Sequence, residues 1–289
     1  MELVAVKTGC PRPALFRALG KSDPPEFVET SGAVYRLDSI LKHDSWAATA
    51  IYRPTTDPTT TGQIICKFNR QQPILGVPMA WLGRKLARRE MEFYRLLADL
   101  PCIAQPCGPV KVDGKAQDHV AAHRFVPGHP LGESENPGAS FFSELERGLA
   151  AIHERGVAFM DLHKRENIIV GTDGRPYLID FQVSFLCKPT SRFSPMFAAL
   201  RLFQSFDLYH LLKHKLRCSG LPAHEIQAIV DRHRPALLRL HRLIAVPWRT
   251  MRRRLLVLLR IRTGKGEAQS EHFTEDGLRD SISPTRRAA

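Results

Sequence analysis

The sequence predicts an α+β protein of two lobes, a small β-rich lobe with one key helix followed by a larger helical lobe. Three observations lead to this expectation. Short runs rich in β-branched and aromatic residues recur through residues 33–126, and one helix-like segment interrupts them. From residue 141 onward most of the chain has a helical pattern. A chain of 289 residues is long enough for one large domain or two small ones.

The first lobe is expected to be built from short strands. A Thr/Pro-rich turn at residues 53–62 separates its early strands from a strand that carries a lysine. Residues 84–98 have the pattern of a helix, and the lobe ends at a Pro-Gly turn after Val126. The strand-like runs lie at 34–41, 46–52, 62–68, 108–112 and 119–126.

A helix over residues 141–155 opens the second lobe, and two strand-like pieces joined by a Thr-Asp-Gly-Arg turn follow it. No internal repeat is visible. We therefore expect five segments: an N-terminal extension (1–32), the first lobe (33–126), the second lobe (127–245), a basic amphipathic helix (246–265) and a disordered tail (266–289).

The net charge of +13 is concentrated in one segment. Residues 232–265 contain 11 Arg and Lys and no acidic residue, which leaves 13 − 11 = +2 for the rest of the chain. After Pro247, apolar residues fall on one helical face and arginines roughly opposite. Such a helix can lie on an anionic membrane surface or pack its apolar stripe on the core, and both possibilities stay open. No nucleic-acid partner is expected, because no recognition motif accompanies the charge.

Several classes of protein are excluded by composition. The longest stretch without a charged side chain, residues 71–83, is too short to cross a bilayer. The N-terminus lacks the basic region and long apolar run of a secretory signal. The six cysteines lack paired zinc-site spacing, so we expect reduced thiols. The expected location is the cytoplasm, with the inner face of the membrane as a peripheral site.

The residues that carry chemistry lie between His153 and Ser184. Asp161 and Asp180 flank the ends of a short predicted hairpin, and Asn167 stands where its first strand begins. Two carboxylates and an amide that converge there form an oxygen-rich site suited to Mg²⁺. One carboxylate outside the metal shell can orient an attacking hydroxyl.

This stretch resembles the protein-kinase-like superfamily. The resemblance implies a two-lobed kinase-like fold that uses ATP and Mg²⁺. By it, Asp161 is the catalytic base, Lys164 contacts the transferring phosphate, and Asn167 and Asp180 hold Mg²⁺. The matching segments are His153-x-x-Gly156-x4-Asp161, Asp161-Leu162 followed by Lys164, Glu166 and Asn167, and Leu178-Ile179-Asp180-Phe181.

The same resemblance assigns Lys67 to the α- and β-phosphates of ATP and asks for a glutamate partner on the following helix. Helical phase chooses Glu90, which shares a face with Leu86, whereas Glu92 points about 200° away. A carboxylate on an apolar face needs a partner that offsets its desolvation, and Lys67 supplies one.

Further roles follow from the resemblance. Asp207 is similar to a buried aspartate that hydrogen-bonds the catalytic-loop backbone, and His153 is expected to pack beneath that loop. The interlobe hinge would run from Arg124 through Phe125 and Val126 to Gly128, with its backbone meeting the adenine. His163, His210 and His214 are expected to be loop or packing residues, since no third metal ligand is evident near the last two.

The sequence departs from the usual pattern in four places. Asp161 and Asn167 are one residue further apart, and Phe159-Met160 stand where His-Arg usually precede the aspartate. Gln182 replaces a glycine after Asp180-Phe181, and no G-x-G-x-x-G occurs. These features are closer to the atypical branch of RIO-like and lipopolysaccharide core (Kdo and heptose) kinases.

Three hypotheses about function follow. The first is a phosphotransferase that acts on a hydroxyl of a lipid-linked glycan, such as lipopolysaccharide core, with residues 246–265 on anionic lipid at the cytoplasmic membrane face. The second is an atypical serine/threonine protein kinase or small-molecule kinase, in which that helix packs on the second lobe. The third is a pseudokinase scaffold that binds nucleotide weakly or not at all.

Overall fold

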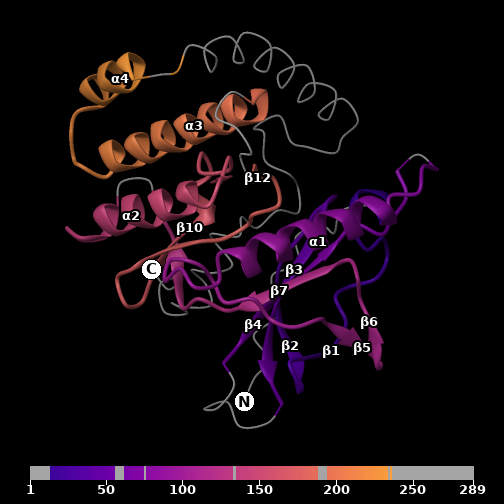
Figure 1. Ribbon diagram of the computed structural model, residues 1–289. Helices are drawn as coiled ribbons and strands as arrows, with labels where there is room; N and C mark the ends of the chain where they lie inside the picture. The colour runs from indigo at the N-terminus through magenta and orange to yellow at the C-terminus, as the bar shows by residue number, and fades with distance from the viewer. Residues whose placement is uncertain are drawn as a thin grey trace.

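The protein is described from a computed structural model that defines residues 14–55, 62–74, 76–132, 135–187, 194–233 and 235. These residues form two lobes: a sheet with one long helix across it, and a helical body beside them (Figure 1). The predicted α+β class and the predicted division into two lobes are confirmed. The expected basic helix at 246–265 and the tail at 266–289 lie outside the described residues, as do residues 1–13 of the expected extension.

A seven-stranded antiparallel sheet in the order β6-β5-β1-β2-β3-β4-β7 forms the first lobe. Its first strand lies within the segment expected to be an extension. It forms there because Val28 and Thr30 are buried and a tight turn at Ser31-Gly32, both with positive φ, returns the chain to its partner strand. The strands are β1 (Phe27–Thr30), β2 (Ala33–His43), β3 (Ala47–Pro54), β4 (Ile64–Asn69), β5 (Lys111–Val112), β6 (Lys115–Ala116) and β7 (Val120–Arg124).

Helix α1 (Ala80–Leu96) packs across β4 and β7, and Figure 1 shows it lying between the sheet and the second lobe. It begins four residues before the predicted start at 84 and ends two before the predicted end at 98. Its buried side chains recur at the helical period, which matches the pattern that predicted the helix. Phe93 and Leu97 extend the contact into the core of the second lobe.

The second lobe contains α2 (Phe141–Glu154), α3 (Pro195–Arg217) and α4 (Ala223–Arg232). A small antiparallel sheet in the order β11-β10-β8 faces the first lobe, and a second strand pair lies near α3. Among the described residues, no helix is long and apolar enough to cross a bilayer. The remaining elements are η1 (Ala14–Phe16), β8 (Gly128–Pro130), β9 (Val157–Ala158), η2 (Arg165–Asn167), β10 (Ile168–Gly171), β11 (Pro176–Leu178) and β12 (Phe185–Leu186).

A cluster of aromatic rings fixes α1 to the second lobe. The ring centroid of Phe181 lies 4.9 Å from that of Phe159, 5.3 Å from Tyr94 and 6.4 Å from Phe93. Phe159 and Phe181 are fully buried, so this contact belongs to the continuous core of both lobes. Because Phe181 directly follows Asp180, the cluster fixes where α1 lies relative to that carboxylate.

Candidate active site

A cavity of about 430 Å³ lies between the lobes. Its roof is one face of the sheet, because the register pairs Thr49 with Lys67 and Ile65 with His123, and paired side chains share a face. The hairpin of β10 and β11 supplies the floor. The apolar end of the cavity, beside the hinge, is lined by Leu41, Ala47, Ile65, Phe125, Val126, Ile169 and Ile179.

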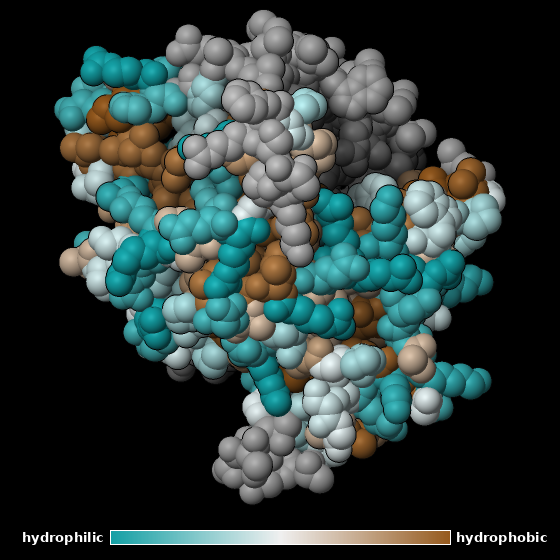
Figure 2. Space-filling view, in the orientation of Figure 1, coloured by the Kyte–Doolittle hydropathy of each residue, from teal (hydrophilic) through white to brown (hydrophobic). Residues whose placement is uncertain are grey.

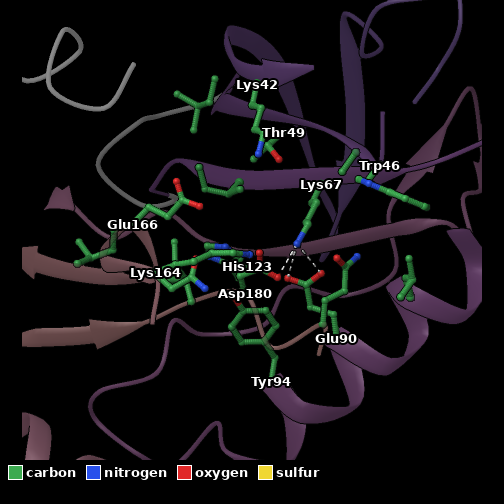
Figure 3. A pocket seen from close by; sticks show the side chains of 18 of the residues that line it. Lys42, Trp46, Thr49, Lys67, Glu90, Tyr94, His123, Lys164, Glu166 and Asp180 are labelled. Carbon is green, nitrogen blue, oxygen red and sulfur yellow. Dashed lines mark hydrogen bonds and ion pairs between the residues drawn. The ribbon is translucent and has the colours of Figure 1, made fainter. Parts of the chain in front are cut away.

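Lys67 lies at the polar end of the cavity, between two carboxylates (Figure 3). Its Nζ is 2.7 Å from Asp180 Oδ1 and 3.3 Å from Glu90 Oε2. The structure thus brings Glu90 to the lysine, while Glu92 is exposed on the opposite side of α1. Three elements meet at this point: β4, α1 and the segment after β11.

Burial and ion pairing shift the pKa values of Lys67, Glu90 and Asp180 in opposite directions. Burial works to lower the pKa of Lys67, but Asp180 and Glu90 outweigh it and raise that pKa. Burial raises the pKa of Glu90 to about 7. Burial also works to raise the pKa of Asp180, yet Lys67 keeps it below its usual value. At neutral pH the site therefore holds a firm ammonium–carboxylate pair, with Glu90 close to titration.

Asp161 is held by hydrogen bonds on one of its two carboxylate oxygens. Lys164 Nζ donates to Oδ2 at 2.7 Å, and Asn167 Nδ2 donates to the same oxygen at 2.9 Å. His163 Nδ1 lies 3.3 Å from the other oxygen, Oδ1. Consecutive tight turns, from Asp161 to Lys164 and from Lys164 to Asn167, take up the extra residue of this loop. The longer spacing therefore leaves Asn167 in contact with Asp161.

The loop before Asp161 is supported from below by Asp207. This carboxylate is 1% exposed and accepts hydrogen bonds from the backbone N–H of Phe159 at 2.7 Å, from that of Met160 at 2.7 Å and from His153 Nε2 at 3.0 Å. Met160 has φ of 65°, a left-handed conformation that costs energy for a side chain of this type. His153 and Asp207 thus lie together beneath the loop, where the sequence placed them.

Asp180 also has a left-handed backbone, with φ of 66°, which aspartate tolerates better than most residues. Its N–H donates to the hydroxyl of Tyr94 at 3.2 Å. Two residues later, Gln182 Nε2 donates to Asn69 Oδ1 at the end of β4 and ties the lobes together. The sequence analysis missed Tyr94 and Asn69. In the sequence, the position of Tyr94, one turn after Glu90 on α1, indicated that it could lie at the site. Nothing in the sequence indicated Asn69.

The turn between β2 and β3 borders the cavity. Asp44 Oδ1 accepts hydrogen bonds from the N–H groups of Trp46 at 2.6 Å and Ala47 at 2.9 Å. Lys42 Nζ lies 2.8 Å from Asp44 Oδ2, and all four residues line the cavity. The sequence analysis did not identify Lys42 or Asp44. The Asp-Ser-Trp run, typical of an Asx turn, was the available signal.

The side chains of the expected hinge residues point in different directions. Phe125 and Val126 line the cavity, whereas Arg124 points to the opposite face of β7, where its Nη1 donates to the Tyr35 hydroxyl at 3.3 Å. The alternation of side chains along a strand explains this, because His123 faces the cavity and its neighbour must face away. Burial lowers the pKa of His123 to about 4, so the imidazole is neutral beside Lys67.

His210 and His214 of α3 are packed beneath the loop that carries Asp161. His214 Nε2 donates to the carbonyl of Leu162 at 2.7 Å, and the ring centroid of His210 lies 5.8 Å from that of His163. Burial lowers the pKa of His210 to about 3 and that of His214 to about 4. Both are therefore neutral supports of the loop.

The residues present fit a magnesium ion. Within the described part of the chain, no group of three or more His, Cys, Asp and Glu side chains is arranged as a metal site. Asp180 and Asn167 offer a carboxylate and an amide oxygen from the same cavity. One or two protein ligands beside phosphates and water are what Mg²⁺ uses in nucleotide sites.

No protein-family model matches the sequence, and no curated protein matches it. Among solved structures, the chain is similar to the Rio2 kinase from Chaetomium thermophilum. The TM-score is 0.44 and the sequence identity 16%, with 66% of this chain and 60% of that chain covered. The match therefore spans less than two thirds of the Rio2 kinase chain.

Proposed function

We propose that this protein is an ATP- and Mg²⁺-dependent phosphotransferase of the kinase-like type. The observation that carries the proposal is the position of Lys67 between Glu90 and Asp180, in one cavity with Asn167 and beside the buried Asp161. A fixed cation, two oxygen ligands for a metal ion and a carboxylate held in one orientation are the parts that phosphoryl transfer requires.

The nucleotide would lie along the cavity with its base at the apolar end, between Ile65 and Ile169 and next to Phe125. Its phosphates would then reach Lys67, with Lys42 at the β2–β3 turn as a second cation. Asp180 and Asn167 would hold Mg²⁺, which supplies neutralisation of the charge on the transferring phosphoryl group.

Asp161 is proposed as the catalytic base. Hydrogen bonds from Lys164 and Asn167 fix its Oδ2, so the carboxylate keeps one orientation when a hydroxyl approaches. The proton of the acceptor hydroxyl would pass to this carboxylate as the hydroxyl oxygen attacks the γ-phosphorus of ATP and ADP leaves. Lys164, 2.7 Å away, would offset the negative charge that develops around the attacking oxygen.

For the acceptor we propose a hydroxyl of a lipid-linked glycan at the cytoplasmic membrane face, such as a lipopolysaccharide core sugar. The support is an apolar rim on the cavity. Trp46, Leu86 and Val183 line it, and Trp46 and Val183 remain about half exposed. An amphipathic acceptor can cover such a rim while its sugar enters the polar end. A protein or small-molecule acceptor would make activity independent of lipid.

The nucleotide site is tested by thermal unfolding of the whole chain with ATP, with and without Mg²⁺. Ligand at 100 times its Kd should stabilise the protein by about 2.7 kcal/mol, a rise in Tm of several degrees. Asp180→Ala should abolish the Mg²⁺-dependent part, whereas Asp113→Asn, on an exposed turn, should retain it. No shift for the wild type at millimolar ATP would favour the scaffold hypothesis.

The acceptor class is tested by comparing phosphoryl transfer to a lipid-linked glycan in vesicles with transfer to the same glycan after its lipid is removed. We expect transfer to the lipid-linked form to be at least ten-fold faster at equal glycan concentration. Equal rates would point to a small-molecule kinase. Transfer to a generic protein substrate at a higher rate than to either glycan would point to a protein kinase.

A further inference from the structure

We infer that the turn preceding α1 inserts into an anionic membrane surface, with the basic face of α1 lying against lipid phosphates. We call residues 73–74 and 76–81 the α1 tip. This inference deepens the proposed function, since it names a docking surface beside the cleft. It depends on the proposed function only for the identity of the acceptor that the cleft would meet at the membrane.

The α1 tip projects from the body of the molecule. In Figure 1 it forms the loop at the upper right, beyond the start of α1, and in Figure 2 brown side chains mark the same place. Val77 is 57% exposed and Trp81 55%, the two highest values among the large apolar side chains of the described residues. Two such side chains on one projection are unusual for a surface that meets only water.

The backbone of the α1 tip is suited to an apolar medium. The N–H of Ile74 donates to the Val77 carbonyl at 3.0 Å, and the N–H of Val77 donates back to Ile74 at 2.9 Å. Gly76, with φ of +82°, allows this tight reversal. Pro73 and Pro78 flank the turn and have no N–H to satisfy. The two paired N–H groups and the two prolines would therefore lose no hydrogen bond to water on insertion.

A basic face begins where the apolar tip ends. Trp81, Lys85 and Arg88 are exposed and follow one another at helical spacing, so they share one face of α1. Neither Lys85 nor Arg88 forms an ion pair within the part of the chain that the structure describes. No acidic residue occurs between residues 71 and 89. An aromatic ring between an apolar tip and basic side chains is the arrangement of an interfacial anchor.

A lipid surface fits this feature better than a folded protein does. A stable protein–protein interface uses roughly 20–30 residues a side and complementary shape. A small projection with two large apolar side chains supplies too little area for that. It can enter the headgroup region, where the basic face gains from negative lipid. The charge pattern therefore selects an anionic membrane as the partner.

The anchor would hold the cleft near the lipid. Leu86 lies five residues after Trp81, about 8 Å along the helix axis, and lines the cavity with Trp46 and Val183. Further along α1, Arg89 donates to the carbonyl of Ser184, just beyond Asp180. Around the helix, Leu86 lies about 140° from Trp81, so a membrane bound at the α1 tip and its basic face lies beside the cleft and not across its mouth.

The test measures binding of the full chain to phosphatidylcholine vesicles with and without phosphatidylglycerol. Lys85→Gln/Arg88→Gln should lower the partition coefficient on anionic vesicles about thirty-fold, because each basic residue near the surface contributes about five-fold. Val77→Ser/Trp81→Ser should lower it at least ten-fold. Matched controls are Lys111→Gln/Lys115→Gln on exposed strands and Leu208→Ser on α3, and both should change it less than two-fold.

Insertion is measured directly with vesicles whose acyl chains carry bromine. Tryptophan fluorescence of the wild type should be quenched more than that of Trp81→Phe. Equal quenching, or tip variants that bind anionic vesicles like the wild type, would overturn the inference. So would a lipid-free dimer that the tip variants abolish, or a loss of RNA binding with vesicle binding intact. ATP-dependent Tm shifts should persist in every tip variant, which separates this outcome from failure of the proposed function.

Discussion

The two sides of the cleft are built in different ways. On the side of Asp161 and Asp180, the side chains of Asp207 and Tyr94 accept hydrogen bonds from the backbone that carries these two carboxylates. On the side of the sheet, Asp44 holds the β2–β3 turn by accepting from the turn's own N–H groups. Those donors are then engaged by a carboxylate and are not offered to a phosphate.

This difference indicates which groups of such a site can be replaced by other chemical groups and which cannot. A base and metal ligands act at fixed atoms, so their positions allow little variation. Phosphate charge can be met by backbone N–H groups or by cationic side chains, because both supply positive potential. Here Lys67 and Lys42 would carry the task that a glycine-rich turn performs elsewhere.

The largest expected effect is that of a substitution at Asp161. Asp161→Asn keeps the size of the side chain but removes its ability to accept a proton, so ATP turnover should fall by about a thousand-fold. The free energy of unfolding should change little. Asp113→Asn, on an exposed turn, is the matched control and should retain full turnover. Unchanged turnover in a purified Asp161→Asn sample would remove Asp161 from the mechanism.

The next effect concerns the support of that loop. Asp207→Ala leaves the N–H groups of Phe159 and Met160 and the ring of His153 without their acceptor in a buried place. We expect a loss of about 3–4 kcal/mol in the free energy of unfolding, measured with urea. Asp207→Asn keeps one acceptor oxygen and should lose less. Equal losses for both variants would contradict this account of the loop.

A third prediction concerns the ion pairs that join the two sides. Burial raises the pKa of Glu90 to about 7, above the 4.5 of an unperturbed glutamate. The folded state therefore binds this proton more tightly, and its stability falls as the pH rises from about 4.5 to 7. Glu90→Gln cannot titrate, so relative to wild type it should gain on the order of 3 kcal/mol between pH 5 and 8.

Urea unfolding at several pH values measures this effect. Glu92→Gln, exposed on the same helix, is the control and should follow the wild-type pH dependence. If Glu90→Gln had the same pH dependence as the wild type, Glu90 would be ionised throughout this range. The charge balance described for Lys67 would then be wrong.

The smallest expected effect tests the sheet side. Asp44→Asn preserves an oxygen that can accept from Trp46 and Ala47 while removing the negative charge near Lys42. ATP should bind about three- to five-fold tighter by isothermal titration, since a partly exposed charge contributes less than about 1 kcal/mol. Asp38→Asn, paired with Arg53 away from the cavity, should leave affinity unchanged. Weaker binding in Asp44→Asn would mean that this carboxylate serves the ligand directly.

Much of the fold and the site could be predicted because the signals are local. The ordered motif residues between His153 and Phe181 are close in sequence, and helical phase alone separated Glu90 from Glu92. What failed depends on contacts between distant segments. The strand at residues 27–30, within the segment expected to be an extension, forms because β2 and β5 pair with it.

Arg70 shows most clearly which kind of contact the sequence does not predict. It is 2% exposed, and its guanidinium donates to four backbone carbonyls, those of Leu15, Ser45, Gln72 and Pro73. These carbonyls come from three separate parts of the chain. No spacing or periodicity in the sequence marks one arginine among many as the one that will be buried, because the partners that offset its desolvation are backbone atoms.

The left-handed residues at Met160 and Asp180 have a consequence for how this protein can change. Met160 directly precedes Asp161 and is held against its own conformational preference by Asp207, and Asp180 carries the carboxylate that pairs with Lys67. Glycine at position 160 would relieve that strain, and a search for stabilising substitutions would favour it. The relaxed loop would also allow the Asp161 carboxylate to adopt several positions. Selection for thermal robustness and selection for turnover should therefore oppose each other at this position.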